Sequence, residues 1–325
     1  MAIKAAKVSV IMPVLNEEHH LADAVASVLG QNFDGELLIA LGPSTDNTNQ
    51  VAAKLAKSDP RVRLVPNPRG LTTVGMNLCI KEAKHDYVVR VDAHSEPATN
   101  YITRGIEILN ETGADLLGGV MAAKGKTLFQ RSVAWAYTSR FGLGGASYHV
   151  GGEAGEAESA YLGIFRKSIL EQVGGYDESI IRGEDWDLAQ RIKAAGSLVW
   201  FSPELSVTYW PRSSWTGLVK QFYSTGVWRG DLTRRDLSRT SLRYFIPPAL
   251  VLSILLGSIL GVLGFIVGWV PVLGYLGAIV AVGFLAGLAP VPLVLATMHL
   301  SWGVGFILGY LRGAAGTIDR SRVTK

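Results

Sequence analysis

The sequence predicts an α/β domain with a doubly wound, mainly parallel sheet and flanking helices, followed by an α-helical transmembrane region. Two observations support this fold class. Short β-branched runs alternate with helical patterns through the first hundred residues, which is typical of a parallel sheet covered by helices on both faces. Residues 244–311 then contain no Asp, Glu, Lys or Arg, and this run is far longer than the roughly 20 residues that cross a bilayer.

The elements of the predicted domain follow one another at short intervals. Strands are expected at 8–14, 36–41, 62–65, 87–92, 115–120 and 197–201, and helices at 17–29, 46–57, 72–83, 97–110, 168–173 and 184–195. Ligands of such sheets bind outside the carboxyl ends of the strands. Residues 13–17, 41–46 and 92–94 lie at three of these ends, so we expect them to share one site. The glycine-rich stretch 141–159 is interpreted either as a surface loop or as a lid over a substrate.

The charges divide the chain into four parts. The net charge of +4 combines −4 over residues 1–211, +5 over 212–243 and +3 over 312–325. We expect a domain at 1–211, a basic amphipathic interface segment at 212–243, transmembrane helices at 244–311 and a basic cytoplasmic tail at 312–325. Basic residues beside membrane spans face the cytoplasm and attract anionic lipid. Nucleic acid is not an expected partner, because the body itself is slightly acidic.

The apolar region is punctuated by Pro271, Pro290 and Pro292 into segments 244–268, 271–289 and 291–311. Three spans fit its length, but they put the two basic flanks on opposite sides of the membrane, against the positive-inside tendency. Two spans with a buried or re-entrant middle segment keep both flanks inside, and the sequence leaves both arrangements open.

The expected location of the body is the cytoplasm. Cys79 is the only cysteine, so no intramolecular disulfide can form, which is consistent with a reducing compartment. Asn16, Glu17 and Glu18 interrupt the first apolar run too early for a secretory signal.

Two acidic clusters are the candidate reactive groups. Asp92 and His94 end the strand at 87–92 at positions i and i+2, so both point to one side and can hold a divalent metal. Glu184 and Asp185 open the helix at 184–195, where one carboxylate can act as a general base. Simpler roles also fit the pattern. His94 can hydrogen-bond the nearby backbone, and an acidic residue at a helix start can be a cap.

Several motifs occur in an order that resembles inverting family 2 glycosyltransferases with the Rossmann-like GT-A fold. These motifs are VSVIMPVLNEE at 8–18, STDNT at 44–48, DAH at 92–94 and GED at 183–185. The chain most resembles the membrane-anchored branch that builds succinoglycan-type exopolysaccharide, with a strand ending RVDAH and the late segment QFYSTGVWR at 221–229. The resemblance covers about residues 8–230 and the general layout of the anchor.

The resemblance implies a role for each cluster. Asp92 and His94 would bind Mn²⁺ or Mg²⁺ and, through Asp92, the donor diphosphate, with the imidazole better suited to Mn²⁺ than to Mg²⁺. Asp185 would be the general base, and Glu184 lies beside it. The nucleotide would be cradled by residues after the first strand, which are Pro13, Asn16 and Glu17.

The chain departs from the family pattern at the second strand. Leu41 stands where the family has the Asp that reads the nucleotide base, so base recognition differs or falls to Asp46. Arg69 and Asn77 resemble a donor-contacting stretch, with helix capping as an equal alternative. Three further residues resemble, in altered order, an element that touches acceptor and diphosphate in polymerising relatives, and for the arginine among them phosphate headgroup binding is the alternative role. They are Gln221, Trp228 and Arg229.

The resemblance implies a multi-pass protein of the inner (plasma) membrane that moves one sugar from a nucleotide-sugar donor to a lipid-linked, polyprenyl-diphosphate acceptor. Such a reaction serves cell-envelope glycan or exopolysaccharide biosynthesis. Two alternatives remain open. A polyprenyl-phosphate sugar synthase would load lipid phosphate directly and needs no general base. A catalytically inactive membrane subunit would bind the sugar nucleotide without consuming it.

Overall fold

The computed structural model describes residues 7–314, so most of the tail expected at 312–325 lies outside the described residues. The described chain forms two compact units. The first comprises residues 7–122 and 146–209, and the second comprises residues 123–145 and 210–314. The segment 123–145 thus groups with the C-terminal helices, although it lies between two stretches of the first unit.

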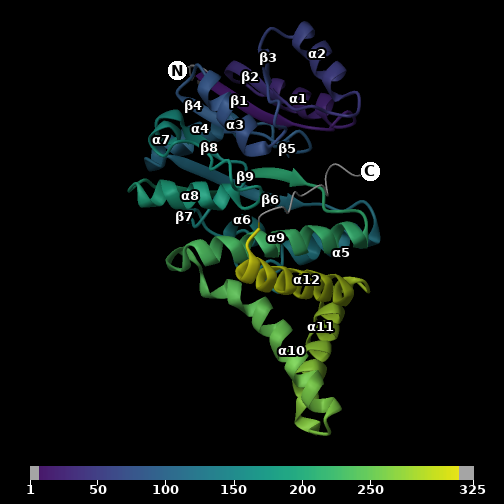
Figure 1. The fold of residues 1–325 in the computed structure, drawn as a ribbon. Coiled ribbons are helices and arrows are strands. Elements are labelled where there is room, and N and C mark those ends of the chain that lie inside the picture. Colours follow the sequence, from purple (N-terminus) through teal and green to yellow (C-terminus); the bar gives the residue numbers. More distant parts are fainter. Residues whose placement is uncertain (1–6, 315–325) are drawn as a thin grey trace. The chain divides into compact units, whose positions relative to one another are not determined.

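A mixed sheet organises the first unit (Figure 1). Its strands lie in the order β3-β2-β1-β4-β8-β6-β9-β5, with β7 paired to β9. Four neighbours are parallel, namely β1 (Lys7–Val14), β2 (Asp34–Leu41), β3 (Val62–Pro66) and β4 (Tyr87–Arg90). The others are β5 (Glu96–Pro97), β6 (Leu116–Ala123), β7 (Gly155–Glu156), β8 (Ile164–Arg166) and β9 (Val199–Tyr209). β8 runs antiparallel to both β4 and β6.

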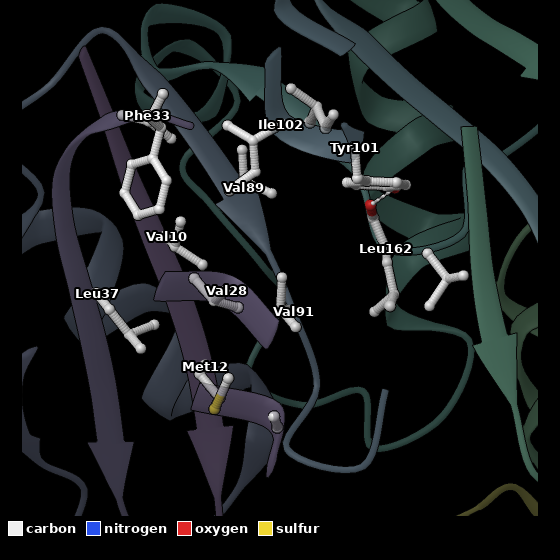
Figure 2. Close-up of a cluster of buried hydrophobic side chains, with 14 of the residues drawn as sticks. Val10, Met12, Val28, Phe33, Leu37, Val89, Val91, Tyr101, Ile102 and Leu162 are labelled. Atoms are coloured by element: carbon white, nitrogen blue, oxygen red, sulfur yellow. Dashed lines mark hydrogen bonds between the residues drawn. The ribbon is translucent and has the colours of Figure 1, made fainter. Parts of the chain in front are cut away.

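Helices cover both faces of this sheet, as the sequence predicted. One face packs against α1 (Leu21–Leu29), α2 (Thr48–Ser58) and α4 (Tyr101–Thr112), and the other against α3 (Thr72–Glu82), α7 (Lys167–Gln172) and α8 (Glu184–Ala194). The short α6 (Ser147–Val150) also belongs to this unit. Alternation along β1 explains the two cores, because Val10 and Met12 enter the first and Ile11 the second. Figure 2 shows the first core, where the Tyr101 hydroxyl donates to the Leu162 carbonyl at 2.6 Å.

The strand register places the ends of β1, β2 and β4 close together, where the sequence predicted a ligand site. Val14 pairs with Leu41 at the ends of β1 and β2, and Ile11 pairs with Arg90 at the end of β4. The segments that follow these three strands therefore start from one edge of the sheet, as expected for a parallel arrangement.

The second unit is helical in its described residues. It contains α5 (Leu128–Tyr137), α9 (Trp215–Arg235), α10 (Ile246–Val262), α11 (Val270–Ala286) and α12 (Val291–Arg312), with 3-10 turns η1 (Leu237–Arg239), η2 (Leu242–Phe245) and η3 (Ile266–Trp269). Three stretches are long and apolar enough to cross a membrane by length and composition. They are Leu242–Val262, Ile266–Ala286 and Val291–Arg312.

The structure differs from the predicted elements in several places. The first helix begins at Leu21, because the residues after Glu17 form a turn before it. The last strand extends to Tyr209, and its buried Leu205 and Val207 alternate with more exposed neighbours beyond Pro203. Helix α5 was not predicted, although Thr127 and Gln130 form a complete capping box at its start.

Candidate active site

A buried arginine joins the two acidic clusters. The side chain of Arg90, the last residue of β4, is only 4% exposed. Its Nε donates to Asp92 Oδ1 at 2.9 Å and its Nη2 donates to Glu184 Oε1 at 3.2 Å. Its Nη1 donates to Asp185 Oδ1. Residues that are more than ninety positions apart in the sequence therefore meet around one guanidinium.

The start of α8 presents its acidic residues without using them as caps. Gly183 is the N-cap residue and adopts a left-handed conformation with a φ of 80°, which suits glycine. Glu184 and Asp185 follow Gly183 inside the helix, so neither occupies the N-cap position. Both carboxylates lie in the first turn, near the positive end of the helix dipole.

The environment of Asp185 raises the pKa of its carboxyl to about 7. Burial is the largest cause, and the negative charges of Glu184 and Asp92 act in the same direction, whereas the Arg90 guanidinium opposes them. Three carboxylates thus share one cation. A carboxyl with a pKa near neutrality is suited to proton transfer at physiological pH.

His94 is oriented by Glu17. The ring Nδ1 of His94 lies 3.0 Å from Glu17 Oε1, which links the segment after β4 to the segment after β1. With Nδ1 engaged, Nε2 is the ring nitrogen that remains for a metal. A carboxylate on the far nitrogen is the usual support of a metal-binding histidine. The backbone role considered for His94 is thus replaced by a side-chain contact.

The two candidate metal ligands at this edge are of residue types that bind divalent cations in proteins. Asp92 contributes a carboxylate and His94 an imidazole, and three acidic groups around one guanidinium leave an excess of negative charge. Among the described residues, no group of three or more His, Cys, Asp or Glu is arranged to hold a metal. An ion here would therefore complete its coordination with oxygens of substrate or water.

The segments after β1 and β2 are joined by hydrogen bonds. Asn16 has a left-handed φ of 56°, and its Oδ1 accepts from the Thr45 backbone at 2.7 Å, while its own N–H donates to Ser44 Oγ at 3.0 Å. The Glu17 N–H donates to Thr48 Oγ1 at 2.7 Å. These contacts fix a non-glycine residue in an uncommon backbone conformation next to Glu17, the partner of His94.

Asp46 also connects the segments that follow β1 and β2. Its carboxylate accepts from the backbone N–H groups of Thr48 at 3.0 Å and Glu18 at 3.3 Å. Although burial acts in the opposite direction, the hydrogen bonds from Thr48 and from Glu18 lower the pKa of Asp46. Pro13 lies in β1 opposite Ala40 of β2, one residue before the strand ends.

Asn77 and Arg69 contact a different part of the first unit. Asn77 lies inside α3, so it is not a helix cap, and its amide exchanges two hydrogen bonds of 2.8 Å with the backbone of Tyr176. Arg69 pairs with Glu178 at 2.6 Å. Both residues thus hold the turn that precedes α8.

Gln221, Trp228 and Arg229 lie on α9 in the second unit. Trp228 is 4% exposed, and the Arg229 guanidinium stacks 4.3 Å from the centre of the Tyr244 ring.

Arg90 and Glu158 were not among the predicted site residues. Arg90 had a recognisable signal, because a lone charge inside the apolar run 87–91 needs buried partners. Glu158 had none, since it lies in the glycine-rich stretch. Its Oε1 accepts from Trp186 Nε1 at 2.9 Å and its carbonyl accepts from Gln190 at 2.8 Å, which fastens this stretch to α8.

Comparison with known proteins identifies clear relatives. Residues 9–174 match the family model described as glycosyl transferase family 2. The succinoglycan biosynthesis protein ExoA of Rhizobium meliloti (strain 1021) is 33% identical over 313 residues, which are 91% of this chain and 93% of that protein. A dolichyl N-acetyl-α-D-glucosaminyl phosphate 3-β-D-2,3-diacetamido-2,3-dideoxy-β-D-glucuronosyltransferase of Methanococcus voltae is 23% identical over 70% of this chain and 74% of its own length.

A solved structure shares the fold. The mannosyltransferase PcManGT from Pyrobaculum calidifontis, in complex with GDP-Man and Mn²⁺, superposes with a TM-score of 0.64 at 15% sequence identity. The match covers 95% of this chain and 89% of that one. At this identity the likeness shows the fold alone.

Proposed function

Because the chain belongs to glycosyl transferase family 2, we propose that it is an inverting, metal-dependent enzyme that moves one sugar from a nucleotide donor to a lipid-linked acceptor. The family and the GT-A type of fold predicted from the motifs are confirmed. Relatives act in succinoglycan biosynthesis and on a dolichyl-phosphate-linked sugar, as their names state, and these names support an acceptor of lipid-linked glycan.

The observation that carries the mechanism is the meeting of Asp92 and Asp185 on Arg90. In our proposal Asp185 is the general base. It accepts the proton of an acceptor hydroxyl as that oxygen forms a bond to the anomeric carbon. The bond from this carbon to the diphosphate oxygen breaks with its electron pair, and attack from the opposite face inverts the configuration. Glu184 keeps the pKa of Asp185 high enough for this transfer through its negative charge.

Asp92 and His94 would hold the metal, and Glu17 would fix the His94 ring so that Nε2 is available. A bound Mn²⁺ or Mg²⁺ supplies charge neutralisation for the departing diphosphate. Arg90 keeps the Asp92 carboxylate in place beside the base. The donor nucleotide would lie at the joined segments after β1 and β2, near Pro13, Asn16 and Asp46, and Arg69 and Asn77, which hold the turn before α8, would be further donor contacts.

The acceptor lipid would approach from the membrane. We propose that Gln221, Trp228 and Arg229 on α9 serve this side, with the Arg229 guanidinium making charge-assisted contacts to a phosphate group. The body would face the cytoplasm at the inner membrane, because the basic residues beside the apolar helices favour that side.

The test is a lipid mass shift. Purified full-length protein is incubated with a panel of nucleotide sugars, Mn²⁺ or Mg²⁺, and membrane lipids that include polyprenyl phosphate and polyprenyl-diphosphate glycans. We expect the mass of one sugar to be added to a lipid-linked glycan, and no addition by an Asp185→Asn variant. Addition to bare polyprenyl phosphate that survives this substitution would instead identify a polyprenyl-phosphate sugar synthase. Metal-dependent nucleotide binding without any transfer would identify an inactive subunit.

A further inference from the structure

The last apolar helix, α12, is long and apolar enough to span a bilayer, yet its neighbour within the second unit is charged. We propose that α12 lies at the membrane surface beside α9, and that α10 and α11 alone enter the hydrocarbon as a hairpin whose two ends emerge on one side. This inference concerns the membrane contact and does not depend on the proposed reaction.

Helix α9 is unsuited to the bilayer interior. Its 21 residues include Lys220, Arg229, Asp231, Arg234 and Arg235. The buried Asp231 carboxylate pairs with Arg234 at 3.1 Å and with Arg235 at 2.6 Å. Charged side chains inside a bilayer are rare because their desolvation is costly, whereas a basic helix with aromatic residues fits the headgroup layer.

Helix α12 is held against α9 by glycines on both helices. A methyl group on Gly226 would overlap the Trp302 carbonyl oxygen, and one on Gly230 would overlap the Phe306 carbonyl oxygen. The relation is mutual, because methyl groups on Gly305 and Gly309 would overlap the carbonyl oxygens of α9. Small residues spaced by four allow two helix backbones to approach this closely.

The contact between the two helices extends over most of α12. Near the start of α9, Trp215 Nε1 donates to Thr297 Oγ1 at 2.7 Å. At the other end Gly313, which follows α12, lies against Arg234 and Asp231. The paired positions advance together along both helices, so α9 and α12 run parallel, as Figure 1 shows. If α12 crossed the bilayer, the charges of α9 would be carried in with it.

Helices α10 and α11 differ from α12 in what surrounds them. In the most apolar part of the α12 stretch, 44% of the residues are buried. The corresponding shares are 11% for the α10 stretch and 17% for the α11 stretch. Both ends of the pair rest on α12, since Gly303 contacts Pro247 and Val251 at the start of α10, and Gly283 near the end of α11 contacts Pro292. The turn between them is apolar and open, with Ile266 86% exposed.

The dimensions of this hairpin fit lipid. Each helix has 17 residues, or about 26 Å at 1.5 Å per residue, which is close to the roughly 30 Å of a hydrocarbon core. A hairpin also returns the chain to the side it left. The basic residues of 212–243 and those of 312–325 then lie on one face of the membrane, which removes the conflict with the positive-inside tendency.

Cysteine accessibility tests this topology. The only natural cysteine, Cys79, is buried, so the unsubstituted full-length protein is the blank. Ser238→Cys marks the chain before α10, Ala289→Cys the connection from α11 to α12, and Arg312→Cys the end of α12. All three positions are exposed. Sealed vesicles of known orientation are treated with a membrane-impermeant maleimide, before and after permeabilisation.

We expect all three variants to be labelled from the same side and to a similar extent. Phe265→Cys, in the turn of the hairpin, should not be labelled from that side. Labelling of Ala289→Cys and Arg312→Cys from opposite sides would establish α12 as a third span and overturn the proposal. Labelling of Ser238→Cys and Ala289→Cys from opposite sides would do the same. So would an Ala289→Cys that reacts only after denaturation, or a Phe265→Cys that reacts from the Ser238 side.

Discussion

The Arg90 guanidinium and the Asp185 carboxylate form a partly buried ion pair that fastens the end of β4 to the first turn of α8. The same guanidinium holds Asp92 on its own strand. The proposed metal carboxylate and the proposed base therefore share one positioning residue. A change at Arg90 should disturb both halves of the reaction, whereas a change at either carboxylate should disturb one.

Substitution of the base should remove turnover and leave the fold intact. Asp185→Asn keeps the size and polarity of the side chain but cannot accept the proton. We expect kcat to fall by about 10²–10⁴-fold, the usual contribution of a general base. Asp187→Asn is the matched control, because this residue lies in the same helical turn and pairs with Arg191 at 2.8 Å. Equal losses in both variants would argue against a specific role for Asp185.

The rate should rise with pH through neutrality. The base acts when deprotonated, and the pKa of Asp185 is raised to about 7 by burial and by the charges of Glu184 and Asp92. We therefore expect kcat to increase between about pH 6 and 8 and to level off above. Glu184→Gln removes one of these charges and should move the midpoint of the profile to lower pH. A midpoint that stays in place in this variant would assign the titration to another group.

Loss of the Arg90 guanidinium should destabilise the first unit. Arg90→Gln leaves three carboxylates without their cation in a buried setting, which costs about 3 kcal/mol. Arg104 offers a matched comparison, since it also contacts three carboxylates but on the surface, with Glu111 and Glu204 more than half exposed. Surface pairs of this kind add little. Thermal unfolding in detergent should therefore show a clear drop for Arg90→Gln and almost none for Arg104→Gln.

The choice of metal should depend on His94. Imidazole favours Mn²⁺ over Mg²⁺, whereas a carboxylate suits both. His94→Asp should thus lower the ratio of Mn²⁺-supported to Mg²⁺-supported kcat/KM. Glu17→Ala removes the support of the ring and should weaken Mn²⁺ binding by about 10-fold or more, measured by Mn²⁺ electron paramagnetic resonance with nucleoside diphosphate present. An unchanged metal ratio in His94→Asp together with unchanged Mn²⁺ binding in Glu17→Ala would exclude His94 as a ligand.

The contact between α9 and α12 should tolerate no added side chain. Gly305→Leu places a branched group against the Tyr223 carbonyl of α9 and should cost about 1–3 kcal/mol or more. Gly274→Leu in α11 is the control, because nothing lies within 4 Å of a Cβ there. Thermal unfolding in detergent should separate the two variants. Equal stability would show that the helices separate without cost.

The alternating pattern of the first hundred residues predicted the parallel half of the sheet and the edge where its site forms. This worked because β1, β2 and β4 are buried on both faces and are followed within a few residues by polar side chains. The antiparallel half of the sheet was harder to predict from the sequence. Its strands include two of only two residues, β5 and β7, which are defined by pairing with β9 and not by a local pattern.

The contacts inside the site show a similar division. The sequence identified Asp92, Glu184 and Asp185 as separate clusters, because local motifs carry that information. Their meeting on Arg90 depends on the end of β4 lying close to the start of α8, which no local pattern encodes. The same holds for Glu17 and His94, which come from segments after different strands.

The glycine contact between α9 and α12 has a consequence for how the protein suits different membranes. Gly303 and Pro292 of α12 contact the two ends of the α10–α11 hairpin. In our topology α9 and α12 lie at the membrane surface, so their lengths do not have to match the thickness of the hydrocarbon core. Bilayers differ in thickness by several ångströms, and spanning helices must follow. One helical turn can therefore be added to both helices of the hairpin, or removed from both, without shifting any residue of α9 or α12. The length of the hairpin can then follow the thickness of the host membrane while the rest of the chain stays unchanged.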